Sequence, residues 1–299
     1  MTIDVSGEFF SKHQKKFREA ICTSPSSIFH YTSSTALISI LQSKKLWFSN
    51  IKFLNDETEN KQIFKVLNSY IESQKDKFNK NYYDSIKILC EQMLDEYDIF
   101  DYLLSGDKNT YVASFSTESD QLNLWNYYTK NPNSIGYNIE FNPKDFAKFS
   151  CHGKSLNYSG QVIYSEEKQL SLLIPLINDF HDKYLTISEQ SYKEMLIQEL
   201  AAILCEFSIF FKLKDFEQES EYRFVWKTSK KAEIRECRNF FVSYVEYSLP
   251  ITSIKSIGIS PTQKDKIVEL GLRELLNNYV YEEDFDQITI KLSNIPVRY

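Results

Sequence analysis

Glycine is scarce in this chain of 299 residues, which contains only seven. The seven are too widely spaced to form G-x-G-x-x-G or G-x-x-x-x-G-K-[ST], two patterns in which bare backbone approaches phosphate oxygens. The sequence therefore argues against a Rossmann dinucleotide site and against a P-loop. A nucleotide bound to this chain would have to be held by side chains and strand edges.

Paired cysteines and long apolar runs are also missing. The five cysteines are odd in number and form no C-x-x-C pair, which argues against a disulfide framework and a zinc knuckle. Cys151-His152 is the one Cys–His neighbour pair and has no second ligand pair, so no metal is predicted. No stretch approaches the ~18 apolar residues of a membrane helix, and Met1–Ser6 lacks the charge pattern of a signal peptide. We expect a cytoplasmic protein that does not enter a membrane.

The charge balance is acidic, with a formal net charge of −6 and a pI near 5.4. Such a balance disfavours a protein that coats nucleic acid through bulk electrostatics. The segment Lys227–Arg238 is a local exception, because five basic residues fall between two predicted strands. It is either a solvated loop or a contact for a substrate phosphate.

Hydrophobic periodicity predicts an α+β chain, because strands and clustered helices do not alternate strictly. We expect one domain over residues 1–299, with helical insertions near 56–106 and 166–213. Period-2 and period-3.6 patterns predict strands that include Tyr111–Ser116, Ile135–Phe141, Leu156–Tyr164, Phe240–Tyr247, Ile254–Ile259 and Gln287–Lys291, and helices that include Gly7–Ile21, Ser34–Ser43, Glu118–Tyr128 and Thr262–Asn277.

The segment His30-Tyr31-Thr32-Ser33 lies where a strand meets a helix. Leu37, Ile40 and Leu41 follow at helical spacing, and Leu46–Ser49 has the pattern of a second strand. A histidine at this junction either faces a ligand or makes a structural hydrogen bond, and the structural role is the commoner one.

An acidic cluster follows in Leu54–Glu59. Asp56 and Glu59 have the spacing of a capping box at the start of a long helix. The alternative is metal binding by Asp56, Glu57 and Glu59, but carboxylates that complement a helix dipole are far commoner.

A second acidic pair lies late in the chain. Alternation that begins at Glu219 places Glu219, Glu221 and Arg223 on one face of a strand. Two carboxylates about 6.5–7 Å apart can meet one ligand and stabilise an oxocarbenium-like transition state at a sugar. The alternative is an exposed strand face on which Glu219 or Glu221 pairs with Arg223 or a lysine.

These motifs resemble two families. The H-Y-T-S, L-N-D-x-x-E, S-F-S with a later W-x-x-Y, and E-x-E-x-R patterns are similar to a large bacterial family of unknown function. An early histidine, a serine-containing middle strand and a late E-x-E also resemble the ADP-ribosyltransferase superfamily. That resemblance implies an ADP-ribosyltransferase-like split mixed β-sheet and an NAD site without a Rossmann motif.

The superfamily resemblance also implies roles for particular residues. Glu221 would act on the nicotinamide ribose as the catalytic glutamate, and Glu219 would orient the acceptor. The expected NAD-binding residues are His30, Tyr31, Thr32, Ser114, Phe115, Ser116 and Tyr128, with the stacking aromatic left open among Tyr31, Phe115, Tyr127 and Tyr128.

The expected function is cleavage of the nicotinamide–ribose bond of NAD, with transfer of ADP-ribose to a macromolecule (protein or nucleic acid) or to water. The resemblance extends this to a bacterial toxin or antiphage effector. The alternative is a non-catalytic sensor module that binds a nucleotide or a protein. A nuclease or end-phosphotransferase would need more basic residues near His30 than the sequence has.

Overall fold

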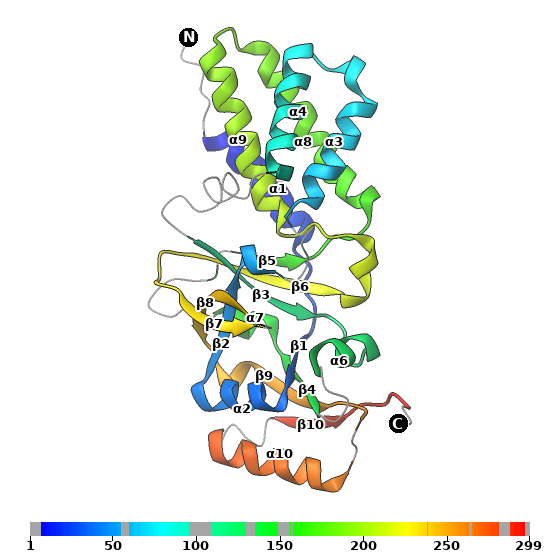
Figure 1. Cartoon of the computed structure of the whole chain (residues 1–299), viewed down its shortest axis with the longest axis vertical. Coiled ribbons are helices and arrows are strands. Elements are labelled where there is room, and N and C mark those ends of the chain that lie inside the picture. The colour runs from blue at the N-terminus through cyan, green and yellow to red at the C-terminus, as the bar shows by residue number, and fades with distance from the viewer. Residues whose placement is uncertain are drawn as a thin grey trace.

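The molecule is elongated, with a helical lobe at one end of a β-sheet and the other helices beside or beyond the sheet (Figure 1). This computed structural model describes residues 7–54, 60–95, 109–129, 135–148, 156, 158–237, 239–262, 265–280 and 288–296. Asp56, Glu57 and Glu59 lie outside the described residues, as do Cys151 and His152.

Among the described residues, five helices form the helical lobe around one apolar core. Phe17 of the first helix stacks on Phe207 of the last, with ring centroids 3.5 Å apart. The helices of the two sequence segments described above as insertions therefore pack with each other and with the N-terminal helix. They are α1 (Gly7–Ile21), α3 (Gln62–Ser73), α4 (Lys80–Asp95), α8 (Glu166–Thr186) and α9 (Gln190–Ser208).

The sheet has the order β10-β9-β4-β1-β3-β2-β8-β7, with β6 paired to β3 and β5 paired to β6. Its pairings are antiparallel, apart from the parallel pair β9–β10. The predicted α+β class with a mixed sheet is confirmed. The strands are β1 (Ile28–Ser33), β2 (Lys45–Asn50), β3 (Asn109–Ser116), β4 (Gly136–Phe141), β5 (Tyr158–Gln161), β6 (Glu221–Thr228), β7 (Glu233–Cys237), β8 (Phe240–Ser248), β9 (Ile254–Ile259) and β10 (Thr289–Leu292).

The sheet divides at β3. One edge of β3 pairs with β6 along its whole length. The other edge is shared, because β2 pairs with Tyr111 and Val112 while β1 pairs only at Ser116. Strands β1 and β2 thus separate from each other over residues 113–115 of β3.

A second apolar core lies on the sheet face opposite the helical lobe. Here α2 (Ser34–Ser43) begins at Ser33, whose side chain accepts a hydrogen bond from the backbone N–H of Ala36. The predicted apolar triplet of α2 is buried, as expected from its helical spacing. In the part of the chain that the structure describes, the other α-helices around the sheet are α6 (Leu122–Thr129), α7 (Pro143–Lys148) and α10 (Lys266–Tyr279).

The helix predicted over Glu118–Tyr128 begins later, at Leu122. Side chains bind the backbone groups of the residues that precede it. The Tyr31 hydroxyl donates to the carbonyl of Glu118 and accepts from the N–H of Gln121, and Ser116 Oγ accepts from the N–H of Glu118. The bond from Tyr31 takes the Glu118 carbonyl, which a helical turn begun at Glu118 would use as its first acceptor.

Candidate functional site

Strand β6 presents its charged residues to one face of the sheet and its aromatic residues to the other. Val225 belongs to the core of the helical lobe, whereas Phe224 and Trp226 belong to the second core. Because side chains alternate along a strand, Glu221 and Arg223 share the face of Val225. The prediction that Phe224 and Trp226 point the other way is confirmed.

The prediction that the strand starts at Glu219 is wrong. Glu219 ends a 3₁₀ helix over Lys214–Glu219, and Ser220 follows with φ 44° and ψ 50°, a left-handed conformation. Strand pairing then begins at Glu221. The turn at Ser220 nevertheless brings the carboxylates of Glu219 and Glu221 to one cation, the ammonium group of Lys212.

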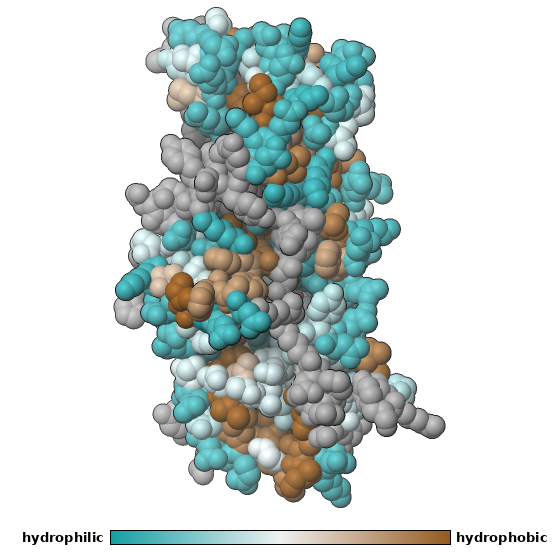
Figure 2. All heavy atoms as spheres, in the orientation of Figure 1, coloured by the Kyte–Doolittle hydropathy of each residue, from teal (hydrophilic) through white to brown (hydrophobic). Residues whose placement is uncertain are grey.

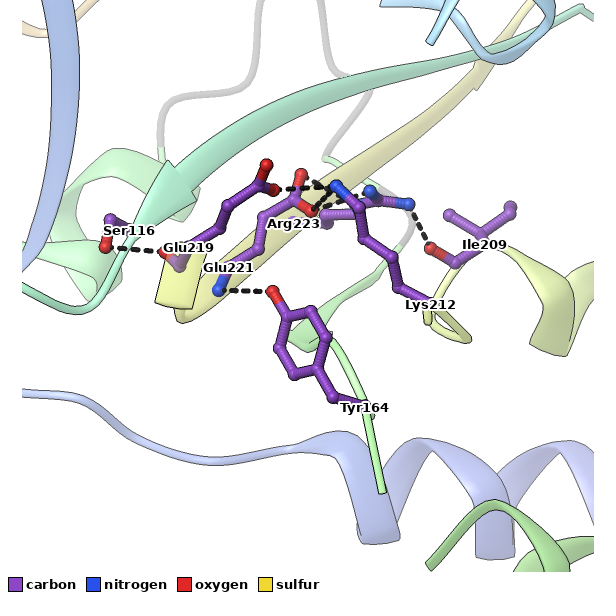
Figure 3. Close-up of polar contacts among 7 residues, drawn as sticks. All are labelled: Ser116, Tyr164, Ile209, Lys212, Glu219, Glu221 and Arg223. Atoms are coloured by element: carbon purple, nitrogen blue, oxygen red, sulfur yellow. Dashed lines mark hydrogen bonds and ion pairs between the residues drawn. The ribbon is translucent and has the colours of Figure 1, made fainter. Parts of the chain in front are cut away.

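Four charged side chains form the Lys212 cluster, which consists of Lys212, Glu219, Glu221 and Arg223 (Figure 3). Lys212 Nζ lies 2.7 Å from Glu219 Oε2 and 3.4 Å from Glu221 Oε2. Arg223 Nε donates to Glu221 Oε1 at 2.9 Å and Arg223 Nη2 donates to Glu221 Oε2 at 2.7 Å, a bidentate pair. Arg223 Nη1 also donates to the carbonyl of Ile209, just after α9, at 2.5 Å. The cluster therefore ties β6 to the end of the helical lobe.

Neighbouring polar groups fix the carboxylates further. The backbone N–H of Glu221 donates to the Tyr164 hydroxyl at 3.0 Å, and Ser116 Oγ donates to the backbone carbonyl of Glu219 at 2.8 Å. Ser114, which pairs with Arg223 across the strands, hydrogen-bonds the side chain of Glu221. Both serines of the S-F-S motif thus contact the acidic pair.

Burial and charge act against each other on Glu221. Its side chain is 8% exposed, while Arg223 is 1% and Lys212 is 6% exposed. Burial alone would raise the pKa of Glu221, but the charges of Arg223 and Lys212 and their hydrogen bonds outweigh it and lower the pKa to about 2. Glu221 is therefore ionised at neutral pH. Two carboxylates and two cations balance each other in the cluster.

The oxygens of Glu221 are heavily engaged. A carboxylate offers about four lone-pair positions, and two hydrogen bonds from Arg223, one contact from Lys212 and one hydrogen bond with Ser114 take these up. The contact with Lys212 is the longest of those measured, at 3.4 Å. Glu219 is the more accessible acid of the pair, since its side chain is 23% exposed.

His30 lies on the opposite face of the sheet from Glu221. Phe29 pairs with Ser116, so Phe29 shares the face of the acidic pair and the next residue, His30, points the other way. The His30 ring lies 5.7 Å from the ring of Phe115 and bonds the backbone of Ser114, in the segment where β1 and β2 separate. Burial outweighs this bond and lowers the pKa of His30 to about 4, so the ring is neutral at pH 7.

The predicted binding residues therefore divide into two groups across the sheet. Thr32 alternates with Tyr31 and shares the face of His30. Phe115 is also on that face and is 3% exposed, with the rings of Phe141, Phe146 and Phe224 around it. The other face holds Tyr31, Ser114, Ser116, Tyr128, Glu219 and Glu221.

Tyr31 and Tyr128 lie close together on the face of the acidic pair. Their ring centroids are 6.3 Å apart, and Tyr128 is 40% exposed. Asn123 of α6 donates a hydrogen bond to Gln218 beside Glu219. Helix α6, which carries Tyr128, is therefore a direct neighbour of the segment that carries Glu219.

Sequence reasoning missed Lys212 and Tyr164. Lys212 follows the apolar run Ile209-Phe210-Phe211, and a lysine that continues such a run is a sign of a buried, paired cation. Tyr164 gave no such sign, because its hydroxyl meets the N–H of Glu221 through long-range packing.

The cavity found elsewhere in the described structure is not lined by the residues of the Lys212 cluster. A surface cavity of about 410 Å³ lies along α1 and is lined by Ser11, Gln14, Lys15, Arg18, Glu19 and Cys22. Among the described residues, no three His, Cys, Asp or Glu side chains are grouped so that they could hold a metal ion. In the same part of the chain, no helix is long and apolar enough to cross a membrane.

A sequence model of the family described as "Protein of unknown function (DUF2971)" matches residues 124–224. The matched segment contains Trp125 and Tyr128 of the W-x-x-Y pattern and the whole E-x-E-x-R pattern, and it begins after the H-Y-T-S and S-F-S motifs. The comparison thus supports the resemblance to an uncharacterised family. Searches of curated proteins and of solved structures returned no significant match.

Proposed function

We propose that this protein is an ADP-ribosyltransferase-like enzyme that cleaves the nicotinamide–ribose bond of NAD on the sheet face that carries Glu221. One observation supports this proposal above the others. The turn at Ser220 brings Glu219 and Glu221 together beside Ser114 and Ser116, and the pKa of Glu221 is held low enough to keep the carboxylate ionised. An anionic group fixed in advance is what a developing positive charge on a ribose requires.

In the proposed reaction Glu221 acts on the ribose. A ribose hydroxyl takes the position of Lys212 on Glu221 Oε2, where the contact is longest. The C–N glycosidic bond then breaks, its electron pair leaves with nicotinamide, and the charge of Glu221 stabilises the oxocarbenium-like ribose.

The acceptor is a macromolecule or water. Its oxygen or nitrogen forms the new bond to the ribose carbon and releases a proton, which Glu219 accepts as the more exposed carboxylate. Tyr128 is the proposed stacking aromatic because it is exposed and lies near Tyr31 on the same face. His30, Thr32 and Phe115 are left out of this site because they belong to the other face.

The experiment is nicotinamide release from NAD by purified protein, with and without cell lysate as a source of acceptors. The proposal expects release by the wild type and a loss of at least about a hundredfold in Glu221→Gln. Glu140→Gln is the matched control, because Glu140 is also a buried glutamate whose pKa is lowered to about 2 and lies on another strand. Equal release by wild type and Glu221→Gln would exclude the assigned role of Glu221.

A second function is favoured by the engagement of the Glu221 oxygens. A carboxylate whose partners are all supplied by the protein suits a non-catalytic module. In such a module the Lys212 cluster holds β6 to the helical lobe, and the same face of the sheet binds a nucleotide or a protein. This function predicts heat of binding for NAD in calorimetry without any nicotinamide release, and binding that survives in Glu221→Gln.

A further inference from the structure

Strand β7 is the last strand of the sheet order, and its outer edge pairs with no strand among the described residues. An edge strand of this kind presents backbone N–H and C=O groups that can pair with another chain. The β7–β8 hairpin is therefore a candidate interaction surface that is independent of the proposed enzyme site.

Apolar side chains are exposed on this hairpin. Ile234 is 62% exposed, Phe241 is 72% exposed and Phe240 is 46% exposed. Figure 2 shows brown side chains gathered over the β7–β8 region of the sheet, with teal ones beside them. Single exposed apolar residues are ordinary, but a group of them beside an open strand edge is typical of a protein–protein contact.

We propose that β7 pairs in antiparallel fashion with β7 of a second copy of this chain, in a register centred on Ile234. A two-fold axis perpendicular to the extended sheet keeps each side chain on its own face. Such a register must therefore be centred on one residue. With Ile234 at the centre, Glu233 of each copy lies opposite Arg235 of the other.

The charges of β7 select this register. Centring on Arg235 would place two arginines opposite each other, and centring on Glu236 would place two glutamates opposite each other. The register centred on Ile234 gives two Glu–Arg pairs and one Ile–Ile pair. Of the three interior positions of β7, it is the one with opposite charges facing each other.

The positions of the side chains agree with this pairing. Phe241 shares the face of Ile234, because Ile234 pairs with Ser243 and side chains alternate along β8. The Ile–Ile contact would thus cover apolar surface that is exposed in one copy. On the other face, Arg235 lies over the ring of Trp47 at 5.6 Å and donates to Ser49 Oγ at 3.1 Å. This arginine is held in place before the glutamate of the second copy arrives.

The test is sedimentation equilibrium of wild type, Glu233→Arg, Arg235→Glu and an equimolar mixture of the two variants. Wild type should dimerise, and each variant alone should bind itself at least about tenfold more weakly because like charges face each other. The mixture should recover the wild-type affinity, since every introduced charge then faces an opposite one. Circular dichroism should show that both variants remain folded.

A second comparison uses two isoleucines of similar exposure. Ile234→Lys should abolish the dimer, whereas Ile267→Lys on α10 should leave it intact, because Ile267 is 71% exposed and lies outside the hairpin. A monomeric wild type would overturn the proposal and direct the search to a partner protein. A dimer that persists in both charge variants, or a mixture that fails to dimerise, would also overturn it.

Discussion

Glu221 and Glu140 are both buried glutamates on strands of the sheet, and their partners differ. Glu221 is held by Arg223 and Lys212, which are 1% and 6% exposed. Glu140 is held by Lys291 at 2.6 Å and Lys255 at 3.5 Å, which are 55% and 44% exposed, and it also accepts from the hydroxyls of Ser27 and Ser256.

The difference shows that a low pKa alone does not reveal how rigidly a carboxylate is held. Burial would raise the pKa of Glu140, but its hydrogen bonds with Lys291, Ser256 and Ser27 outweigh burial and lower it to about 2, as in Glu221. If an exposed lysine beside Glu140 is removed, water can hydrogen-bond the carboxylate in its place. Water cannot reach Glu221 in the same way when the buried Arg223 is removed. Removal of a partner should therefore lower the free energy of unfolding more at Glu221 than at Glu140.

The largest effect should come from removing the arginine. Arg223→Met leaves Glu221 buried with one cation and leaves the Ile209 carbonyl without its donor, so we expect a loss of about 3–5 kcal/mol in the free energy of unfolding. Urea denaturation measures this loss, provided that the free energy of unfolding falls with urea concentration at the same slope in the variant and the wild type. The double variant Glu221→Leu/Arg223→Met should recover part of it, because the uncompensated charge is removed. A loss below about 1 kcal/mol would contradict the distinction between the two sites.

Much of the fold followed from local pattern, because periodicity depends on residues close in the chain. The triplet of α2 and the two faces of β6 were predicted correctly on that basis. The start of β6 was wrong because Ser220 adopts a left-handed conformation, and nothing in the residue type requires this. The start of α6 was wrong because Tyr31, which is distant in sequence, donates to the carbonyl of Glu118, the acceptor that an earlier helical turn would use.

The candidate site was only partly predictable for the same reason. The pairing of Glu221 with Arg223 is a contact between residues two apart on one strand, and it was among the alternatives. Its burial depends on Lys212 and on α9, which the sequence pattern did not connect to the strand. The face of His30 depends on how β1 pairs with β3, and no residue pattern specifies that pairing.

Glu221 and Glu140 should contribute similarly to the loss of stability at acidic pH. Because the folded-state pKa of each is lowered to about 2, the stabilisation is complete above the unfolded pKa near 4.5 and is lost as the pH falls from 4.5 towards 2. Glu140→Gln and Glu221→Gln should each remove about 2–3 kcal/mol of this acid-dependent loss. Thermal unfolding at several pH values between 2.5 and 5 (about the range in which both groups titrate) measures it. If the stability of both variants falls with decreasing pH as steeply as that of the wild type, the low pKa values are contradicted.

His30 extends the comparison to a partly buried group whose pKa is lowered by desolvation and not by a charged partner. Its pKa is lowered to about 4 from 6.5, so protonation favours the unfolded chain and stability is lost as the pH falls from 6.5 to 4. His30→Gln keeps an N–H donor for the backbone of Ser114 and does not titrate. We expect the wild type to lose about 2–3 kcal/mol more than this variant over that interval. Parallel curves of stability against pH for the two proteins would contradict the lowered pKa of His30.

The smallest effect on stability should come from removing Lys291, an exposed partner of Glu140. Lys291→Ala leaves Ser27, Ser256 and Lys255 on the carboxylate, and the lysine that is lost is 55% exposed. We therefore expect a loss of less than about 1 kcal/mol in the free energy of unfolding, which shrinks further as salt screens the pair. Denaturation at low and high ionic strength measures both properties. A loss comparable to that of Arg223→Met, or one independent of salt, would mean that Glu140 is held as rigidly as Glu221 and that the exposure of a partner does not determine its contribution.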